Sequence, residues 1–136
     1  MDMQISSLMV TPVITVKADA TVAEVTDVLM RNRLSFVPVT ECAGGPVLGI
    51  IGANDLLYFK TSGCDLDTVR AWQICAYKPH AVQMDAAAID VARLMVERQV
   101  HHVVVMRGKE LAGVVSSLDF LKQYIAQVEG EQIRQA

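Results

Sequence analysis

The chain repeats itself, and this repeat constrains the fold more than any other feature of the sequence. The motif Val16-x-x-Asp19-Ala20 recurs as Val82-x-x-Asp85-Ala86, 66 residues later. After a loop that is shorter by two residues, the spacing becomes 64, which maps Asp55 onto Asp119. Self-similarity at a fixed spacing is typical of a repeated supersecondary unit. The chain should therefore contain two copies of one small fold.

Each half predicts the same order of elements, which is strand, helix, strand, strand, helix. In the first half, the apolar run at 13–16 predicts a strand. Thr21-x-x-Glu24 follows as a capping box, in which a hydroxyl and a carboxylate each satisfy an unpaired backbone donor at a helix start. The helix that it opens should bury one face. The apolar positions of that face are Val22, Val25 and Leu29.

Two strands and a second helix complete the first half. We expect the strands at 36–39 and 47–51, around a turn at Gly44-Gly45-Pro46. Pro38 has no backbone donor, so it should lie at a sheet edge or at a bulge. Asn54-Asp55 then opens the helix.

The second half repeats these signals. Its first helix carries Val91, Leu94 and Met95 on one face. Strands are expected at 103–105 and 111–115, and the last helix should open within 116–119 and extend through Glu129. The fold class is therefore α/β (α+β), built from two β-α-β-β-α units.

A short helical lead precedes each half, at 5–9 and at 69–75. With the polar stretch 61–67 as linker, domain 1 should cover 1–62 and domain 2 should cover 63–136. Four methionines are expected to fill the core, since Met adapts to irregular gaps. They are Met9, Met30, Met84 and Met95, while Trp72 and Cys75 should be packing residues of the helical lead at 69–75.

Charge and composition exclude several classes of function. The chain has 12 basic and 15 acidic residues, a net charge of −3 and no basic block, which disfavours nucleic acid as a partner. No apolar stretch is long enough for a membrane span, and the N-terminus lacks the pattern of a signal peptide. Cys42, Cys64 and Cys75 fit no zinc pattern, so we expect no metal site and a reducing cytoplasm.

At this point the sequence resembles a known family. The runs Ile5–Met9, Val13–Val16 and Asp19–Val22 look like the entry of a cystathionine-β-synthase-type (CBS) domain. Leu34–Val39 followed by Gly49–Asp55 continues the pattern. The second half ends with Gly113-Val-Val-Ser-Ser-Leu-Asp119, which is similar to the family's ligand signature, Gly, two apolar residues, Ser or Thr, and Asp three residues later. The resemblance covers nearly the whole chain.

The resemblance implies a sensory module that is not an enzyme. CBS domains pair about a pseudo-twofold axis and leave two clefts, where members of the family bind AMP, ADP, ATP or S-adenosylmethionine. Two pairs commonly form a disc, which implies a homodimer here. The sequence offers no nucleophile with a base and no Walker or Rossmann glycine pattern. The chain should therefore bind an adenosyl ligand as a regulator, need no cofactor, and signal to a separate effector protein. The alternative is an interaction module that no longer binds nucleotide.

The favoured site lies in the second half. The resemblance implies that Asp119 accepts the ribose hydroxyls, a role that suits a carboxylate because it only accepts hydrogen bonds. Asp119 could instead serve the helix dipole alone. Ser116 could cap the helix, reach a phosphate, or do both.

Two further segments belong to this predicted site. His101 matches a histidine that contacts phosphate in nucleotide-binding CBS pairs, and His102 stands where those pairs have arginine; either ring could instead face solvent or core. Tyr77, Lys78, Pro79 and His80 match a segment that wraps adenine, with Tyr77 available to stack and Lys78 to meet phosphate. An ordinary exposed loop is the alternative for this segment.

The first half has a weaker version of the site. Thr11, Pro12, Val13 and Ile14 occupy the adenine-wrapping segment, and Asp55 is the counterpart of Asp119. Gly52 replaces the Ser or Thr of the signature, so this site lacks the hydroxyl, although glycine lets a backbone approach closely. The second site should therefore dominate.

Overall fold

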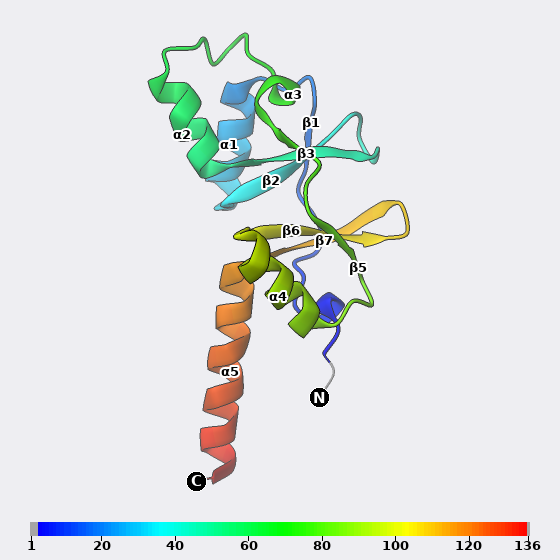
Figure 1. Cartoon of the computed structure of the whole chain (residues 1–136). Coiled ribbons are helices and arrows are strands. Elements are labelled where there is room, and N and C mark those ends of the chain that lie inside the picture. Colours follow the sequence, from blue (N-terminus) through cyan, green and yellow to red (C-terminus); the bar gives the residue numbers. More distant parts are fainter. Residues whose placement is uncertain (1–2, 136) are drawn as a thin grey trace. The chain divides into compact units, whose positions relative to one another are not determined.

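The computed structural model describes residues 3–135, with no side chains described beyond 132. The chain folds into two compact units (Figure 1). The continuous unit comprises Ile14–Pro79. The split unit joins the described residues up to Val13 with those from His80 onward.

The continuous unit carries a four-stranded sheet in the order β1-β2-β3-β4. β1 runs parallel to β2, and the other neighbours are antiparallel. The elements of this unit are β1 (Val16–Lys17), α1 (Val22–Asn32), β2 (Phe36–Thr40), β3 (Val47–Gly52), α2 (Ala53–Thr61), α3 (Ala71–Ile74) and β4 (Ala76–Tyr77).

The split unit carries a three-stranded sheet in the order β5-β6-β7, again with one parallel and one antiparallel pairing. Its last helix extends well away from this sheet (Figure 1). The elements are the 3-10 helix η1 (Ile5–Ser7), β5 (Ala81–Gln83), α4 (Ala88–Arg98), β6 (His102–Arg107), β7 (Glu110–Ser116) and α5 (Ser117–Gln135).

The sequence repeat is reproduced in fine detail by the backbone. A bulge interrupts β2 after Val39 and β6 after Val105, 66 residues later. α1 and α4 each end at a residue in the left-handed region, Arg33 with φ 54° and Gln99 with φ 55°. Each of these residues donates its N–H to two carbonyls of the last turn, which closes the helix end. The two β-α-β-β-α units are thus confirmed.

Each compact unit contains the lead segment of the other repeat. Ile5 N–H donates to Ala86 O at 2.8 Å, which joins η1 to the second repeat. Ala71 N–H donates to Ala20 O at 2.7 Å, and β4 pairs with β3, which join the second lead to the first repeat. The compact units therefore divide the chain differently from the sequence repeats. The expected boundary between 1–62 and 63–136 concerns the repeats and stays a prediction.

Each unit has its own apolar core. Val22, Val25 and Leu29 are at most 4 % exposed, so the predicted face of α1 is confirmed. Val91 and Met95 play the same part in α4, and Ile5 of η1 is fully buried beside them. Each such side chain contributes about 1.5–3 kcal/mol through burial. Each core therefore rests on one helix packed against one sheet.

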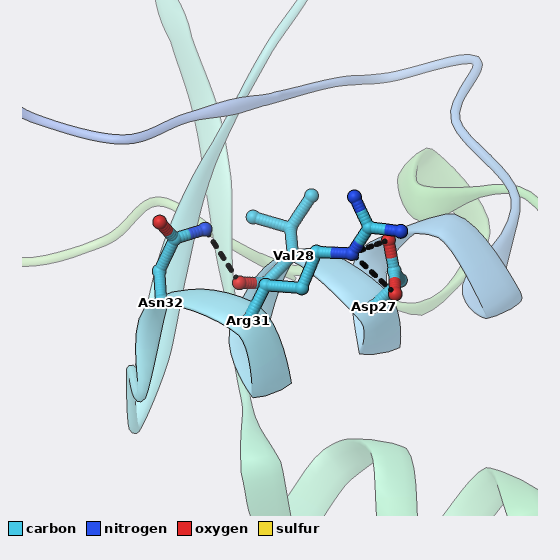
Figure 2. Close-up of polar contacts among 4 residues, drawn as sticks. All are labelled: Asp27, Val28, Arg31 and Asn32. Carbon is cyan, nitrogen blue, oxygen red and sulfur yellow. Dashed lines mark hydrogen bonds and ion pairs between the residues drawn. The ribbon is translucent and has the colours of Figure 1, made fainter.

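The opposite side of α1 carries polar pairs that contribute little. Figure 2 shows Arg31 beside Asp27, with Nε 3.0 Å from Oδ2 and both side chains more than half exposed. A pair at this spacing contributes about 0.3–0.5 kcal/mol. Asn32 Nδ2 donates to Val28 O at 2.8 Å, which satisfies a carbonyl near the helix end (Figure 2).

Several sequence expectations need correction. The first strand begins at Val16, not Val13, and α5 continues past Glu129. Met30 is 74 % exposed, so it does not fill the core, and Trp72 of the second lead is half exposed, at 49 %. Of the capping box, the structure shows the hydroxyl half, in which Thr21 Oγ1 accepts from Glu24 N–H.

Pro38 lies in β2, an inner strand of its sheet, so the edge alternative is wrong; the bulge between Val39 and Thr40 begins at the next residue. The repeat shows what the proline costs. Val104, its counterpart in β6, donates its N–H to His80 O at 2.9 Å. Pro38 has no such donor, and β1 pairs only with Val39 and Thr40. The proline therefore goes with a shorter first strand.

Gly49 in β3 and Gly113 in β7 are strand residues with other parts of the chain packed closely against them. A Cβ at Gly49 would lie 2.4 Å from Ala76 O, and a Cβ at Gly113 would lie 2.6 Å from Met9 Sδ. Both contacts are too short for real atoms, so a glycine suits each strand where β4, which continues the second lead, and Met9 of the first lead come close to it.

We predict that Gly49→Ala destabilises the protein by about 2–3 kcal/mol, because it meets backbone, and Gly113→Ala by about 1 kcal/mol, because the Met9 side chain can move. Urea unfolding would measure both losses. Gly130→Ala is the matched control: its Cβ meets nothing within 4 Å on α5, and it should stabilise by about 0.5–1 kcal/mol. An equal loss of unfolding free energy for Gly49→Ala and Gly113→Ala would show that the Met9 side chain does not move aside.

Candidate functional site

The start of α5 presents a capped carboxylate. Asp119 Oδ2 accepts from Ser116 N–H at 2.8 Å and from Ser116 Oγ–H at 3.0 Å. Ser116 Oγ in turn accepts from Asp119 N–H at 3.4 Å. Both side chains are half-buried. These reciprocal bonds fix the carboxylate over the first turn of the helix, where unpaired N–H groups favour negative charge.

The histidine pair lies beside this cap. His102 is the antiparallel partner of Ser116, and Ser117 N–H donates to His101 O at 2.9 Å. The two imidazole rings lie 6.5 Å apart between centroids. His101 is exposed and His102 is half-buried. The split unit therefore brings four of the predicted site residues into one corner, between the start of β6 and the start of α5.

The continuous unit has a simpler corner at the start of α2. Gly52 N–H donates to Asp55 Oδ2 at 2.9 Å, and Ala53 N–H donates to Ser35 O at 2.9 Å. The backbone pattern matches that of α5, but Gly52, unlike Ser116, has no hydroxyl to donate to the carboxylate. Asp55 is exposed.

The corner in the continuous unit also lacks the imidazoles. Ser35 and Phe36 stand at the positions of His101 and His102, and Phe36 is the antiparallel partner of Gly52. The spacing of 66 between the repeats makes these positions equivalent.

The predicted adenine-wrapping residues fall on both sides of the unit boundary. Tyr77, Lys78 and Pro79 belong to the continuous unit, and His80 begins the second stretch of the split unit. Lys78 is exposed, with φ 56°. A lysine in the left-handed region is uncommon, and such residues cluster at functional sites.

Tyr77 is tied to the second lead. Its side chain is half exposed, and its hydroxyl donates to Trp72 O. Desolvation by its surroundings raises the pKa of the Tyr77 phenol, and the nearby Cys75 adds to this. Burial raises the pKa of the Cys75 thiol. Both groups are therefore neutral at pH 7 and act as packing and hydrogen-bonding groups.

The corresponding residues of the weaker site also straddle the unit boundary. Thr11, Pro12 and Val13 belong to the split unit, and Ile14 begins the continuous unit. Thr11, Pro12 and Ile14 are exposed, and Val13 is half-buried. None of the four carries charge, in contrast to Lys78.

The described residues form neither a metal-binding cluster nor a membrane-spanning helix. Among residues 3–135, no group of three or more His, Cys, Asp or Glu side chains is placed to hold a metal ion. No helix in that range is long and apolar enough to cross a membrane.

Comparison with known proteins decides the family. The model of the CBS domain matches residues 5–61 and again 71–126. The chain belongs to the CBS-domain family. Its two matches make it a tandem CBS pair, as the internal repeat predicted.

Solved CBS structures share the fold. The CBS domain protein PAE2072 from Pyrobaculum aerophilum, complexed with AMP, is 27 % identical with a TM-score of 0.79, covering 86 % of this chain and 89 % of that one. The CBS domain pair of protein MJ0100, in complex with 5′-methylthioadenosine and S-adenosyl-L-methionine, has a TM-score of 0.83 at 17 % identity, covering 93 % and 99 %.

A curated relative is longer. Protein MJ1404 of Methanocaldococcus jannaschii is 27 % identical over 94 % of this chain. The CBS pair spans about a third of that protein, 33 % of its length.

The three thiols differ in environment, which predicts their order of alkylation. Cys42 is exposed, Cys64 donates its S–H to Phe59 O at 3.0 Å, and Cys75 is buried with a raised pKa. Because the thiolate is the nucleophile, iodoacetamide should label Cys42 first and Cys75 last. Mass spectrometry of timed samples at pH 8 measures this order. Early labelling of Cys75 would show that the second lead opens readily.

Proposed function

We propose that this CBS pair is a regulatory module that binds an adenine nucleotide at the start of α5 and signals to a separate effector protein. The observation that carries the proposal is the capped Asp119 with two histidines beside it, in a chain whose relative PAE2072 is complexed with AMP. In this proposal the chain needs no cofactor, catalyses no reaction and works in the cytoplasm.

The proposal assigns Asp119 to the ribose. Asp119 Oδ2 accepts the two bonds from Ser116, and Oδ1 is the oxygen that we propose for a sugar hydroxyl. A charge-assisted bond of this kind contributes about 1.5–3 kcal/mol. His101 and His102 supply donors for a phosphate, since imidazole donates from both nitrogens when protonated. Lys78 adds a positive charge on the predicted adenine segment.

The second candidate function is an interaction module without nucleotide. The corner around Gly52 favours it for the first half, because Gly52 replaces the serine of the signature and no histidine stands at positions 35 and 36. The corner around Asp119 favours nucleotide binding for the second half. We therefore propose two unequal sites, with the Asp119 site dominant.

We predict that Asp119→Ala abolishes the tight phase of AMP binding and that Asp55→Ala leaves it nearly intact. Lost hydroxyl, imidazole and lysine contacts separate the sites by roughly 2–3 kcal/mol, or about 30- to 150-fold in affinity. Calorimetric titration of AMP measures the two phases.

Asp119→Asn is the matched control, since its amide oxygen can still accept the cap bonds while the charge is lost. It should fold like the wild type and still lose the tight phase. Equal losses of AMP affinity for Asp55→Ala and Asp119→Ala would contradict the assignment of the dominant site to the second half. Equal affinity for GMP and AMP, or for neither, would count against adenine recognition and favour the interaction module.

We also propose that the chain forms a homodimer. The support is an apolar helix surface that is exposed to solvent in both repeats. α1 and α2 border a groove of about 590 Å³. Met30 and Leu57 on this groove are 74 % and 61 % exposed, and their repeat counterparts Val96 and Leu121 are 78 % and 57 % exposed. Patches of this kind mark interaction sites, and a second copy offers matching apolar faces within a closed symmetry.

A double charge at these faces should dissociate the dimer. We predict a dimer at micromolar concentration in analytical ultracentrifugation, and a monomer for Met30→Glu with Leu57→Glu. Asp27→Lys is the control on the polar side of α1 and should leave the dimer intact. A wild-type monomer would refute the proposal.

A further inference from the structure

We infer that the groove between α1 and α2 of one chain receives the outer part of α5, residues 121–132, from a second copy of the chain. The inference rests on the proposed homodimer and names the surface that covers the groove. Its starting point is the length of α5. The match to the CBS-domain model ends at residue 126, whereas the helix continues to Gln135.

The outer part of α5 exposes an apolar stripe. Leu121, Ile125 and Val128 follow one another at spacings of four and three residues, which puts them on one side of the helix. Leu121 is 57 % exposed and Ile125 is 54 % exposed. The helix starts against β7 and then leaves the sheet of its own unit (Figure 1). An apolar stripe on a helix that leaves its core calls for another surface to cover it.

Acidic residues flank this stripe. Because successive residues of a helix are rotated by about 100°, Glu129 lies on one side of the stripe and Glu131 lies on the other. Both glutamates are exposed, and neither belongs to an ion pair within the described residues. The outer part of α5 is therefore an apolar face between two negative charges.

The groove has the complementary character. Its lining is mostly apolar, and the charged residues in it, Arg33 and Lys60, are both basic. Both are exposed, and neither belongs to an ion pair in the part of the chain that the structure describes.

The two cations stand at opposite ends of the groove. Arg33 ends α1 close to the start of α2, since Ala53 N–H donates to Ser35 O at 2.9 Å. Lys60 lies in the last turn of α2, roughly 10 Å along that helix. A helix that crosses the groove therefore meets one cation on each flank.

Charge also decides between α5 and a second groove as the occupant. Two grooves face to face would bring Arg33 and Lys60 of one chain against the same residues of the other, and like charges across an interface are unfavourable. The acidic flanks of α5 turn this repulsion into attraction. Each chain carries both a groove and a helix, so two such contacts can form about one twofold axis and close the assembly.

Charge reversal on each surface tests the inference by analytical ultracentrifugation. Glu129→Lys with Glu131→Lys, the helix variant, should weaken the dimer at least about 30-fold, because attractive pairs become repulsive in both contacts. Arg33→Glu with Lys60→Glu, the groove variant, should do the same. An equimolar mixture of the two variants should restore the dimer, since every helix then meets a groove of opposite charge. Gln127→Lys is the control, because it adds a charge on the side of α5 opposite the stripe, and it should leave the dimer intact.

The outcomes separate this inference from the proposed homodimer. A helix variant that remains a dimer would overturn the inference alone and favour contact between two grooves. A mixture that stays monomeric would overturn it as well, since α5 would then not enter the groove of another chain. Wild-type protein that is a monomer would refute the homodimer itself. Circular dichroism checks that both variants keep the fold, as expected for four exposed side chains.

Discussion

The fold depends on the close passage of each lead segment over a glycine in the middle of a strand. At Gly49 the second lead comes within 2.4 Å of where a Cβ would lie, and at Gly113 the first lead does the same at 2.6 Å. A Cβ at either position would force a neighbour to shift, and at Gly49 that neighbour is backbone. Each compact unit therefore contains segments of both repeats, and each has its own sheet and core.

This dependence explains what the sequence could and could not predict. The repeat, the helix faces and the strand positions follow from periodic patterns, and Val22, Val25 and Leu29 are buried as expected. The exchange of leads leaves no such pattern, since Ile5 is apolar whichever core it enters. For Met30 the residue type alone predicts the interior, yet it lies on an exposed face of α1.

Part of the candidate site can likewise be predicted from the sequence, and part cannot. Asp119 and Ser116 are recognisable because a capped helix start needs those residue types at that spacing. The direction of the Ser116 hydroxyl is not recognisable, because it depends on which acceptor lies nearest after folding. Pro38 is a similar case. Proline normally marks an edge, but a first strand of two residues turns part of an inner strand into a local edge.

The cap at the start of α5 contains two kinds of hydrogen bond, those of the backbone and that of the Ser116 hydroxyl. Its backbone bonds, from Ser116 N–H to Asp119 and from Ser117 N–H to His101 O, hold the start of α5 against β6 and recur at Gly52 and Ser35. They are structural, since both halves keep them. The Ser116 hydroxyl bond has no counterpart at Gly52, which carries no side chain, and it lies beside His101 and His102. The fold of this corner does not depend on the bond, since Gly52 and Asp55 reach the same backbone arrangement without it. Divergence between the repeats thus separates the bonds that folding requires from those that are free to vary.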